Sequence, residues 1–311
     1  MLLTGERFGV DPRSTVTVGG HPARVMFASE SRLAFLVPSD VEGGGAEVLV
    51  DGVGTDAVLT VGVSWATGLH QVDNPVFGPA GDLFVTYSGS RGQEAPVSIF
   101  RVTRTGTREP FASGIVNATS MTFGPDGALY VSSRFEGAVY RVAADGTFEQ
   151  AASDLGVACG LAFDRDGALY VGDRSGTIFR VVAGKASAFA TLPPSVAAFH
   201  LAMSPDGELF VSAPTLGSYD YVYRIDRQGT VRTVPRPFGR PQGLAFSPDG
   251  HLHVVDALAG TSGVYRFRDL ETAPELLVSA GSLVGLAVGP DGELVVSSND
   301  TAYRFDASPG T

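Results

Sequence analysis

Two side chains in this sequence have the chemistry for proton transfer and stand at matching places in a repeated pattern. Each copy of the pattern carries a short apolar run before a turn of the Pro-Asp-Gly type. His200 occupies a position of this run that is Gly, Ser or Asn in the other copies, and Asp73 directly precedes that position in the first copy. With a carboxylate beside it, an imidazole can act as general base for water attack on a lactone or an ester. The alternative for His200 is a packed histidine bonded to a backbone carbonyl.

A second group of residues could bind an anion. Four arginines stand in the segments that flank the repeated runs: Arg91, Arg134, Arg174 and Arg240. Their guanidinium groups present forked donors to a carboxylate or a phosphate, while Asp73, Asn117 and Gln242 could fix hydroxyl groups of the same ligand. The alternative is a structural use, in which these arginines pair around a rim with neighbouring acids: Glu94, Glu136, Asp173 and Asp220.

The composition restricts both the fold and the partners. The chain has 311 residues with 40 glycines, 19 prolines and only 18% charged residues, which favours short strands and tight turns over long helices. With 22 basic against 33 acidic residues the net charge is −11, so a nucleic acid would be repelled and is not expected as a partner. The single cysteine, Cys159, excludes an internal disulfide and any multi-cysteine zinc or iron–sulfur site.

The sequence also bears on the membrane and the compartment. No stretch approaches the ~18 consecutive apolar residues of a membrane-spanning helix, so we expect no membrane insertion. The first residues, MLLTGERFGVD, carry neither a basic leader nor an apolar signal core. The chain as written is therefore expected to be cytoplasmic, and it would be exported if an upstream signal had been lost.

One phrase occurs six times and predicts the architecture. Its copies are GPAGDLFV, GPDGALYV, DRDGALYV, SPDGELFV, SPDGHLHV and GPDGELVV. The fourth residue of every copy is a glycine: Gly81, Gly127, Gly167, Gly207, Gly250 and Gly292. Their separations of 46, 40, 40, 43 and 42 residues match the period of a four-stranded propeller blade, which is ~40–45 residues. Six copies predict six blades.

Each copy has the sequence of a β-hairpin followed by two further strands. In the third copy an apolar run, residues 160–163, enters a turn formed by Asp and Gly, and a β-rich run, residues 169–171, leaves it. A third strand contains an arginine between apolar residues, and a weaker fourth strand completes the blade, as residues 147–151 do in the second copy. We expect the recurring arginines to buttress turns or blades: Arg101, Arg141, Arg180, Arg224, Arg266 and Arg304.

The two ends of the chain complete the predicted organisation. The last copy stops after its third strand, and we expect residues 64–72 to supply the missing strand and so close the ring. Residues 1–62 lack the repeat and show short alternating strands joined by Gly, Pro, Asp and Ser turns, which predicts a small β-sandwich. The predicted fold is all-β, with an N-terminal Ig-like β-sandwich over residues 1–62 and a six-bladed β-propeller over residues 63–311.

The repeated units resemble a known family. Six units of the type GLAF-x-PDG-x-LYV, over residues 64–307, are similar to NHL repeats and to the related senescence-marker-protein and gluconolactonase family. The segments GERF, VTVGGHPARV and a VP followed by AEVLVDG resemble the IPT/TIG immunoglobulin-like domain. That family has another strand and a Gly-rich turn before the position of Leu3, so the resemblance implies an N-terminally incomplete domain. Propellers carry lactonases, lyases, dehydrogenases and inert scaffolds alike, so the resemblance implies the fold more firmly than an activity.

The resemblance to gluconolactonases implies a place for a metal. In that family the ligands enter the channel one residue before the GL-type pair, and the equivalent residues here are Asp73, Thr119, Cys159, Phe199, Gln242 and Val284. Asp73 and Gln242 are the candidate metal ligands. A hard divalent cation takes several oxygen ligands, usually with more than one carboxylate, and one carboxylate remains here. We expect no required cofactor, and Ca or Zn are the ions to test.

These observations favour recognition of a small polar or anionic ligand, or of a segment of a protein partner, at the mouth of the propeller channel. The first alternative is a hydrolase of lactones or esters, of the gluconolactonase type, with an eroded metal site or with His200 as general base. The second alternative is a non-catalytic scaffold, whose sandwich and propeller rim bind protein while the channel has no role.

Overall fold

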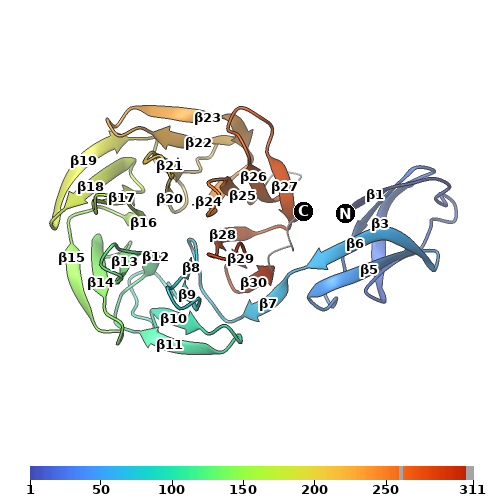
Figure 1. Ribbon diagram of the computed structural model, residues 1–311, viewed down its shortest axis with the longest axis horizontal. Coiled ribbons are helices and arrows are strands. Elements are labelled where there is room, and N and C mark those ends of the chain that lie inside the picture. The colour runs from blue at the N-terminus through green and yellow to red at the C-terminus, as the bar shows by residue number, and fades with distance from the viewer. Residues whose placement is uncertain (259–261, 306–311) are drawn as a thin grey trace. The chain divides into compact units, whose positions relative to one another are not determined.

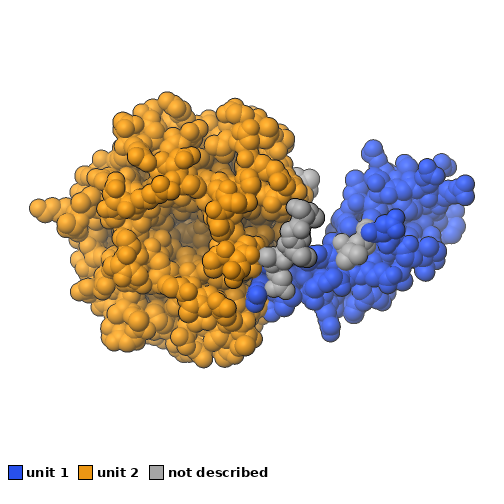
Figure 2. Space-filling view, viewed as in Figure 1, with its two compact units in different colours: residues 1–64, 303–305 blue, residues 65–302, 306–311 orange. Residues whose placement is uncertain are grey.

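The computed structural model describes residues 1–258 and 262–305, which lie in strands, turns and loops (Figure 1). The described chain divides into two compact units, residues 1–64 with 303–305 and residues 65–302 (Figure 2). The end of the predicted propeller domain, residues 306–311, lies outside the described residues, as do residues 259–261. No helix within the described ranges has the length and hydrophobicity needed to cross a membrane.

The first unit is built on one six-stranded antiparallel sheet with the order β1-β4-β3-β2-β5-β6. Its strands are β1 (Leu2–Thr4), β2 (Val16–Val18), β3 (His21–Ser29), β4 (Arg32–Leu36), β5 (Gly44–Val50) and β6 (Val53–Val61). The first part of β3 pairs with β2, where Ala23 lies opposite Val16, and its second part pairs with β4, where Val25 lies opposite Phe35. Both parts of the sheet contribute to one buried core, which includes Phe35 and Val48.

This topology does not establish the predicted sandwich, because one strand order runs through all six strands. The short alternating strands predicted within residues 1–62 are found as β2 to β6. Strand β1 is a further short strand that the sequence pattern did not indicate. A sandwich needs two separate sheets. Here β3 spans 9 residues and changes partner along its length, so hydrogen bonds join all six strands in one order.

Six four-stranded sheets form the blades of a six-bladed all-β propeller, which confirms the architecture predicted from the repeats (Figure 1). The innermost strands are β8 (Val76–Phe77), β12 (Ala118–Phe123), β16 (Ala158–Phe163), β20 (His200–Met203), β24 (Pro241–Phe246) and β28 (Leu283–Val288). The second strands are β9 (Leu83–Thr86), β13 (Leu129–Ser133), β17 (Leu169–Asp173), β21 (Leu209–Ser212), β25 (Leu252–Asp256) and β29 (Leu294–Ser298). The third strands are β10 (Ile99–Val102), β14 (Ala138–Val142), β18 (Thr177–Val182), β22 (Asp220–Ile225), β26 (Gly263–Phe267) and β30 (Ala302–Phe305). The outer strands are β11 (Arg108–Ala112), β15 (Phe148–Ala152), β19 (Lys185–Thr191), β23 (Val231–Phe238), β27 (Glu275–Ser279) and β7 (Val63–Ala66).

The turns between the first and second strands explain why glycine recurs at a fixed period. The turn glycines all have φ between +75° and +86°: Gly81, Gly127, Gly167, Gly207, Gly250 and Gly292. A side chain is strained in this left-handed region, and glycine is not. The period read from the sequence is therefore a backbone requirement of the hairpin in each blade.

Strand β7 closes the ring. It stands beside β30 in the last blade, whose order is β28-β29-β30-β7. The strand covers Val63–Ala66 and is shorter than the predicted closing segment, residues 64–72, because the chain turns at Gly68 with φ +68°. Trp65 packs in a buried cluster that contains residues of the first and the last blade. The predicted closure by strand exchange is thus confirmed with a corrected boundary.

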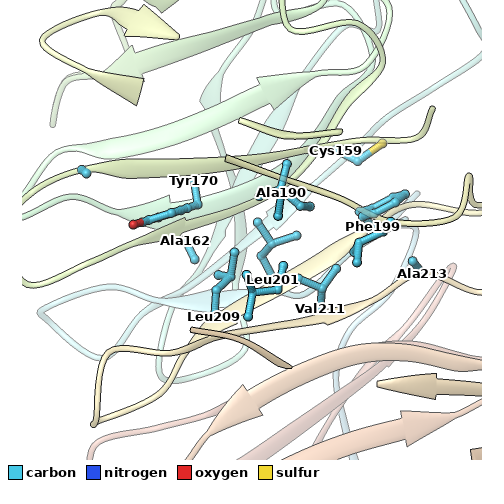
Figure 3. Packing of buried hydrophobic residues seen from close by; sticks show 13 residues of the cluster. Cys159, Ala162, Tyr170, Ala190, Phe199, Leu201, Leu209, Val211 and Ala213 are labelled. Atoms are coloured by element: carbon cyan, nitrogen blue, oxygen red, sulfur yellow. The ribbon is translucent and has the colours of Figure 1, made fainter. Parts of the chain in front are cut away.

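Apolar side chains fill the spaces between neighbouring blades. Between the third and fourth blades, Leu201 packs in a cluster that has Tyr170 at one end and Cys159 with Phe199 at the other (Figure 3). A Cβ added at Gly160 would lie 2.5 Å from the carbonyl oxygen of Phe199. Glycine at this position therefore allows two inner strands to approach each other beside the channel.

Five of the third-strand arginines pair with acids of their own blades, in agreement with the predicted structural role. Nε of Arg141 lies 2.7 Å from Oδ2 of Asp126, in the turn of the same blade, and Arg224 pairs in the same way with Glu208. Further pairs join Arg101 to Glu109, Arg180 to Asp164 and Arg266 to Glu275.

Candidate functional site

One end of the channel gathers the loops that vary between blades. Each inner strand begins beside the end of the second strand of its own blade, as the pairs Ala118 with Ser133, Ala158 with Asp173 and Pro241 with Asp256 illustrate. The loops that enter the inner strands and those that leave the second strands therefore lie at the same end, here named the channel mouth. The predicted site residues stand on these segments: Asp73, Arg91, Asn117, Arg134, Arg174, His200, Arg240 and Gln242.

Three of the arginines lie within electrostatic reach of one another. Burial lowers the pKa of the Arg134 guanidinium, and the positive charges of Arg174 and Arg91 lower it further. Arg134 and Arg174 are partly buried, whereas Arg91 is exposed. Like charges repel more strongly where water is partly excluded, so this cluster favours an anion among its members.

These arginines have no acidic partner in the described part of the chain. None of the ion pairs formed by residues 1–258 and 262–305 includes Arg91, Arg134, Arg174 or Arg240. Arg174 donates through Nη2 to the carbonyl of Val196 at 3.1 Å. The Nε atoms of Arg174 and Arg240 are buried without a hydrogen-bond partner. Donors of this kind are rare in folded proteins unless water or a ligand meets them.

The acids that could have neutralised the arginines bind other groups. Asp173 accepts from the backbone N–H of Val157 at 2.8 Å, and Asp220 accepts from the backbone of its own loop at 2.9 Å. Glu136 accepts from the hydroxyl of Tyr140 at 3.0 Å. The structural alternative, in which these acids pair with the mouth arginines, is therefore not found among the described residues.

His70 belongs to the mouth, although the sequence patterns assigned it no role. Burial lowers the pKa of its imidazole, and the positive charge of Arg134 lowers it further. The ring packs edge-on against Tyr87 with a centroid distance of 5.8 Å. Its place in the segment that enters the first blade was the one signal available in the sequence, and proximity to Arg134 required the fold.

Asp73 and His200 meet across the channel, although 127 residues separate them. Nδ1 of His200 is hydrogen-bonded to Oδ1 of Asp73, and Nε2 of His200 lies 3.1 Å from Oε1 of Gln242. The same oxygen of Asp73 accepts from the backbone N–H of Asn74 at 2.7 Å. The first, fourth and fifth blades are therefore joined by one set of side-chain contacts.

Asn74 extends this set to the last blade. Its Nδ2 donates to the carbonyl of Leu244 at 2.9 Å, and its Oδ1 accepts from the backbone N–H of Leu286 at 3.0 Å. A Cβ added at Gly243 would lie 2.2 Å from Oδ1 of Asn74, so glycine makes room for this bridge. We name the four residues that cross the channel the channel network: Asp73, Asn74, His200 and Gln242.

Side chains of the channel network are bonded to one another, as expected for residues with a structural role. The side chain of His200 is 0% exposed and that of Asp73 is 2% exposed. A general base must reach the proton that it removes, directly or through one water, but Nε2 of His200 faces Gln242. Oδ2 of Asp73 is buried without a hydrogen-bond partner. The structure thus brings the two predicted catalytic residues together, and base catalysis by His200 would require Gln242 to move.

Cys159 is fully buried in β16. Burial raises the pKa of its thiol to about 12, and the negative charge of Asp73 also raises it, while Arg174 and Arg134 lower it. A thiol with this pKa stays protonated near neutral pH, which agrees with the expected buried, unreactive cysteine. Since charges of both signs act on Cys159, the carboxylate of Asp73 and the arginines stand close to the same point of the channel.

Asn117 has a positioning role. Its Nδ2 donates to the carbonyls of Ser88 and Ser90 at 2.6 and 2.9 Å, and its Oδ1 accepts from the N–H of Gly92 at 2.7 Å. These bonds fix the loop that carries Arg91. The prediction that Asn117 binds ligand hydroxyl groups is therefore corrected, because its amide is already used within the protein.

A cavity of about 360 Å³ lies toward the other end of the channel. The later parts of all six inner strands line it, with Phe77, Phe163 and Phe246 among the apolar side chains and Ser120 among the polar ones. None of the predicted ligand-binding residues lines this cavity. The candidate site at the mouth and the cavity are therefore different parts of the channel.

The predicted metal ligands do not fit a metal site. Oδ1 of Asp73 and Oε1 of Gln242 both face the imidazole of His200, which takes the place between them. Among the described residues, no group of three or more His, Cys, Asp or Glu side chains could hold a metal ion. Calcium takes six to eight oxygen ligands and zinc takes about four ligands, so the one free carboxylate oxygen falls short of either.

The comparisons with known proteins agree on the fold. The model of the N-terminal region of strictosidine synthase-like proteins matches residues 160–181, within the third blade. No curated protein matches the chain in sequence. A structural-genomics protein provisionally assigned as a gluconolactonase is 17% identical, with a TM-score of 0.62 over 78% of this chain and 90% of that chain.

Two further solved structures are similar to this chain in fold. Virginiamycin B lyase from Staphylococcus aureus is 15% identical, with a TM-score of 0.55 over 79% of this chain and 88% of that chain. An auxiliary nutrient binding protein from Bacteroides thetaiotaomicron is 12% identical, with a TM-score of 0.61 over 98% of this chain and 93% of that chain. At these identities the likeness establishes the fold alone, because one propeller fold supports many functions.

The contact between Asp73 and His200 predicts a coupled loss of stability. Asp73→Ala and His200→Ala should each lower the free energy of unfolding by about 3–5 kcal/mol, because each leaves its buried partner uncompensated. The double variant should lose less than the sum, with a coupling energy of at least about 1 kcal/mol. Urea unfolding, followed by the fluorescence of Trp65, the single tryptophan, measures these values.

A second His–Asp contact in the chain provides the control. Nδ1 of His251 lies 2.8 Å from Oδ2 of Asp249, whose side chain is 62% exposed. The same cycle at this pair should give a coupling below about 1 kcal/mol, because water screens the interaction. Strictly additive losses at Asp73 and His200 would contradict the contact across the channel.

Proposed function

We propose that the channel mouth binds a small molecule through an anionic group, held by Arg134 and Arg174 with Arg91 and His70 beside them. The observation that carries this proposal is the cluster of guanidinium groups for which the described residues supply no acidic partner. Guanidinium groups bind carboxylates and phosphates through charge-assisted, frequently bidentate hydrogen bonds. A partly buried position strengthens such bonds relative to the open surface.

The charge of the whole chain supports a ligand over a structural use of these arginines. Acidic residues outnumber basic ones by 33 to 22, so carboxylates are plentiful. The third-strand arginines use them, as Arg141 does with Asp126. The mouth arginines lack such partners within the described ranges, and this contrast favours an anion from outside the chain.

Asp73 is expected to orient the ligand. Its negative charge acts on Cys159 together with the positive charges of Arg134 and Arg174, so the carboxylate acts on the same part of the channel as the arginines. An anionic group is repelled by Asp73 and attracted by the arginines. We therefore expect the anion on the side of this pair of arginines away from Asp73, and neutral hydrogen-bonding groups of the ligand toward Gln242, which is partly exposed.

A lactone or ester hydrolase is the second candidate, and the contact between Asp73 and His200 favours it. A carboxylate that orients a histidine is a common arrangement for a general base. The proposal requires Gln242 to leave Nε2 of His200, to which it is bonded. Equal turnover of lactones and aryl esters by the wild type and by His200→Ala would remove this candidate.

For the N-terminal unit we keep the interpretation as an IPT/TIG-like, Ig-like domain, and for the blades the interpretation as NHL-like repeats. The likeness to the auxiliary nutrient binding protein extends over 98% of this chain, which supports a comparable two-part organisation there. A binding role fits the description of that protein. A scaffold for a protein partner is the remaining alternative, and it gains if no small anion binds.

Removal of two mouth arginines should weaken anion binding. Arg134→Ala combined with Arg174→Ala should lower the affinity for sulfate, phosphate and acetate at least about tenfold, because a hydrogen bond to a charged group contributes about 1.5–3 kcal/mol. The loss should be larger at low than at high ionic strength, because salt screens the interaction. Titration calorimetry at two salt concentrations measures both effects.

A charge-matched variant separates the site from net charge. Arg165 and Arg227 stand in turns at the opposite end of their blades, and Arg165→Ala with Arg227→Ala removes the same formal charge. This control should bind as the wild type does. Equal weakening by both double variants would assign the effect to the net charge and contradict the site.

Anion binding should raise the pKa of His70. In the free protein, burial and the positive charge of Arg134 hold this pKa below its usual 6.5. A bound anion offsets the charge of Arg134 and favours the imidazolium, so binding takes up a proton. Affinity should therefore rise as the pH falls through the pKa values of His70 in the bound and the free protein. An NMR titration of the His70 ring with and without sulfate measures the shift, and an unchanged pKa at saturating sulfate would contradict the proposal.

A further inference from the structure

The channel mouth also carries exposed apolar side chains. In the described part of the propeller, four large hydrophobic side chains are more than half exposed: Phe135 at 54%, Leu216 at 91%, Tyr219 at 59% and Leu258 at 64%. All four stand in loops that leave a second strand, namely β13, β21 or β25. These loops belong to the channel mouth, and the four residues are named the apolar rim.

Phe135 brings the apolar rim next to the arginines. It follows Arg134 directly in the sequence, and a Cβ added at Gly92 would lie 2.9 Å from its ring. Gly92 in turn follows Arg91, and its N–H donates to Oδ1 of Asn117 at 2.7 Å. An aromatic surface therefore lies against the loop that carries Arg91, which hydrogen bonds fix, and it directly follows Arg134 in the chain.

Exposure elsewhere on the propeller is smaller and scattered. Phe148 and Leu276 lie on outer strands and Val182 ends the third strand β18, and they are 37%, 40% and 48% exposed. Single apolar side chains at a surface are ordinary, and their gathering around one concave feature is typical of a binding site. Of these loops, the one after β13 also carries a mouth arginine, Arg134, so the apolar rim and the arginine cluster meet there.

The mouth arginines and the apolar rim together favour one class of ligand. A carboxylate or other anion bound by Arg134 and Arg174 would bring whatever is attached to it to the loop that carries Phe135. A hydroxyl-rich body would lose water contacts there without gaining hydrogen bonds from the apolar side chains. An aliphatic or aromatic body would instead remove those side chains from water. An anionic membrane surface fits poorly, because the chain carries a net charge of −11.

Resting on the function proposed above, we infer that the ligand is an amphipathic organic anion: a small carboxylate with an aliphatic or aromatic body. The carboxylate binds the arginines of the mouth, and the body lies on the apolar rim beginning at Phe135. Burial of one methylene group raises affinity by up to about fourfold, so the apolar body contributes as much as the charge once several carbons are covered.

A chain-length series tests this inference with defined probes. Acetate, butanoate, hexanoate and octanoate are titrated into the full chain by calorimetry at one pH and ionic strength. Affinity should rise with each added pair of methylene groups, and octanoate should bind at least about tenfold more tightly than acetate. Octanol should bind at least about tenfold more weakly than octanoate, because it lacks the anion.

Variants of the apolar rim provide the matched comparison. Phe135→Ser with Leu216→Ser and Leu258→Ser should lower the affinity for octanoate at least about fivefold and leave that for acetate within about twofold. Phe148→Ser with Val182→Ser removes apolar surface from β15 and from the end of β18, and it should change neither affinity. All these side chains are more than one third exposed, and a thermal unfolding scan verifies that the variants fold.

The outcomes distinguish a failure of this inference from a failure of the proposed anion binding. Equal affinity for acetate and octanoate overturns the inference and leaves anion binding intact, as does equal weakening by the rim variant and its control. Equal binding of octanol and octanoate also overturns it, because the arginines would then have no part in recognition. Absence of binding by every carboxylate and by sulfate overturns both the inference and the proposed function.

Discussion

The closed ring is the constraint on which every feature of the channel depends. Sheets arranged around an axis would leave an open edge where the chain ends, and β7, which precedes the first blade in sequence, covers that edge by completing the last blade. Closure also holds the start of the first inner strand, since the N–H of Gln71 donates to the carbonyl of Asn299 at 2.9 Å. Asp73 follows two residues later, so its contact with His200 across the channel rests on this closure.

Charges of both signs act at one part of the channel. The pKa of Cys159 is raised by Asp73 and lowered by Arg134 and Arg174, and His200 forms the hydrogen bond that holds Asp73 in place. The chain as a whole carries a net charge of −11, so its long-range field opposes the approach of an anion. Recognition must then come from short-range contacts, and apolar contact beside the arginines adds to them without adding charge.

Much of the fold followed from the sequence, because its repeated features are local. Turn glycines with positive φ and alternating strands are set by neighbouring residues, and they predicted six blades and the closing strand. The arginines of the mouth could also be predicted, since residues after equivalent strands must lie at one end. The roles of Asn117 and His70 could not, because they depend on side chains of other loops. The predicted N-terminal sandwich is not established, because β3 pairs with β2 over its first part and with β4 over its second, and this change of partner has no signal in its sequence.

The central claim is that an external anion is bound between Arg134 and Arg174. The most direct measurement is a crystal structure of the protein grown with selenate, in which anomalous scattering from selenium locates the anion. The account predicts a strong anomalous peak within hydrogen-bonding distance of both guanidinium groups. Selenate bound only elsewhere on the surface, with Arg134 and Arg174 paired to carboxylates of the chain, would contradict it.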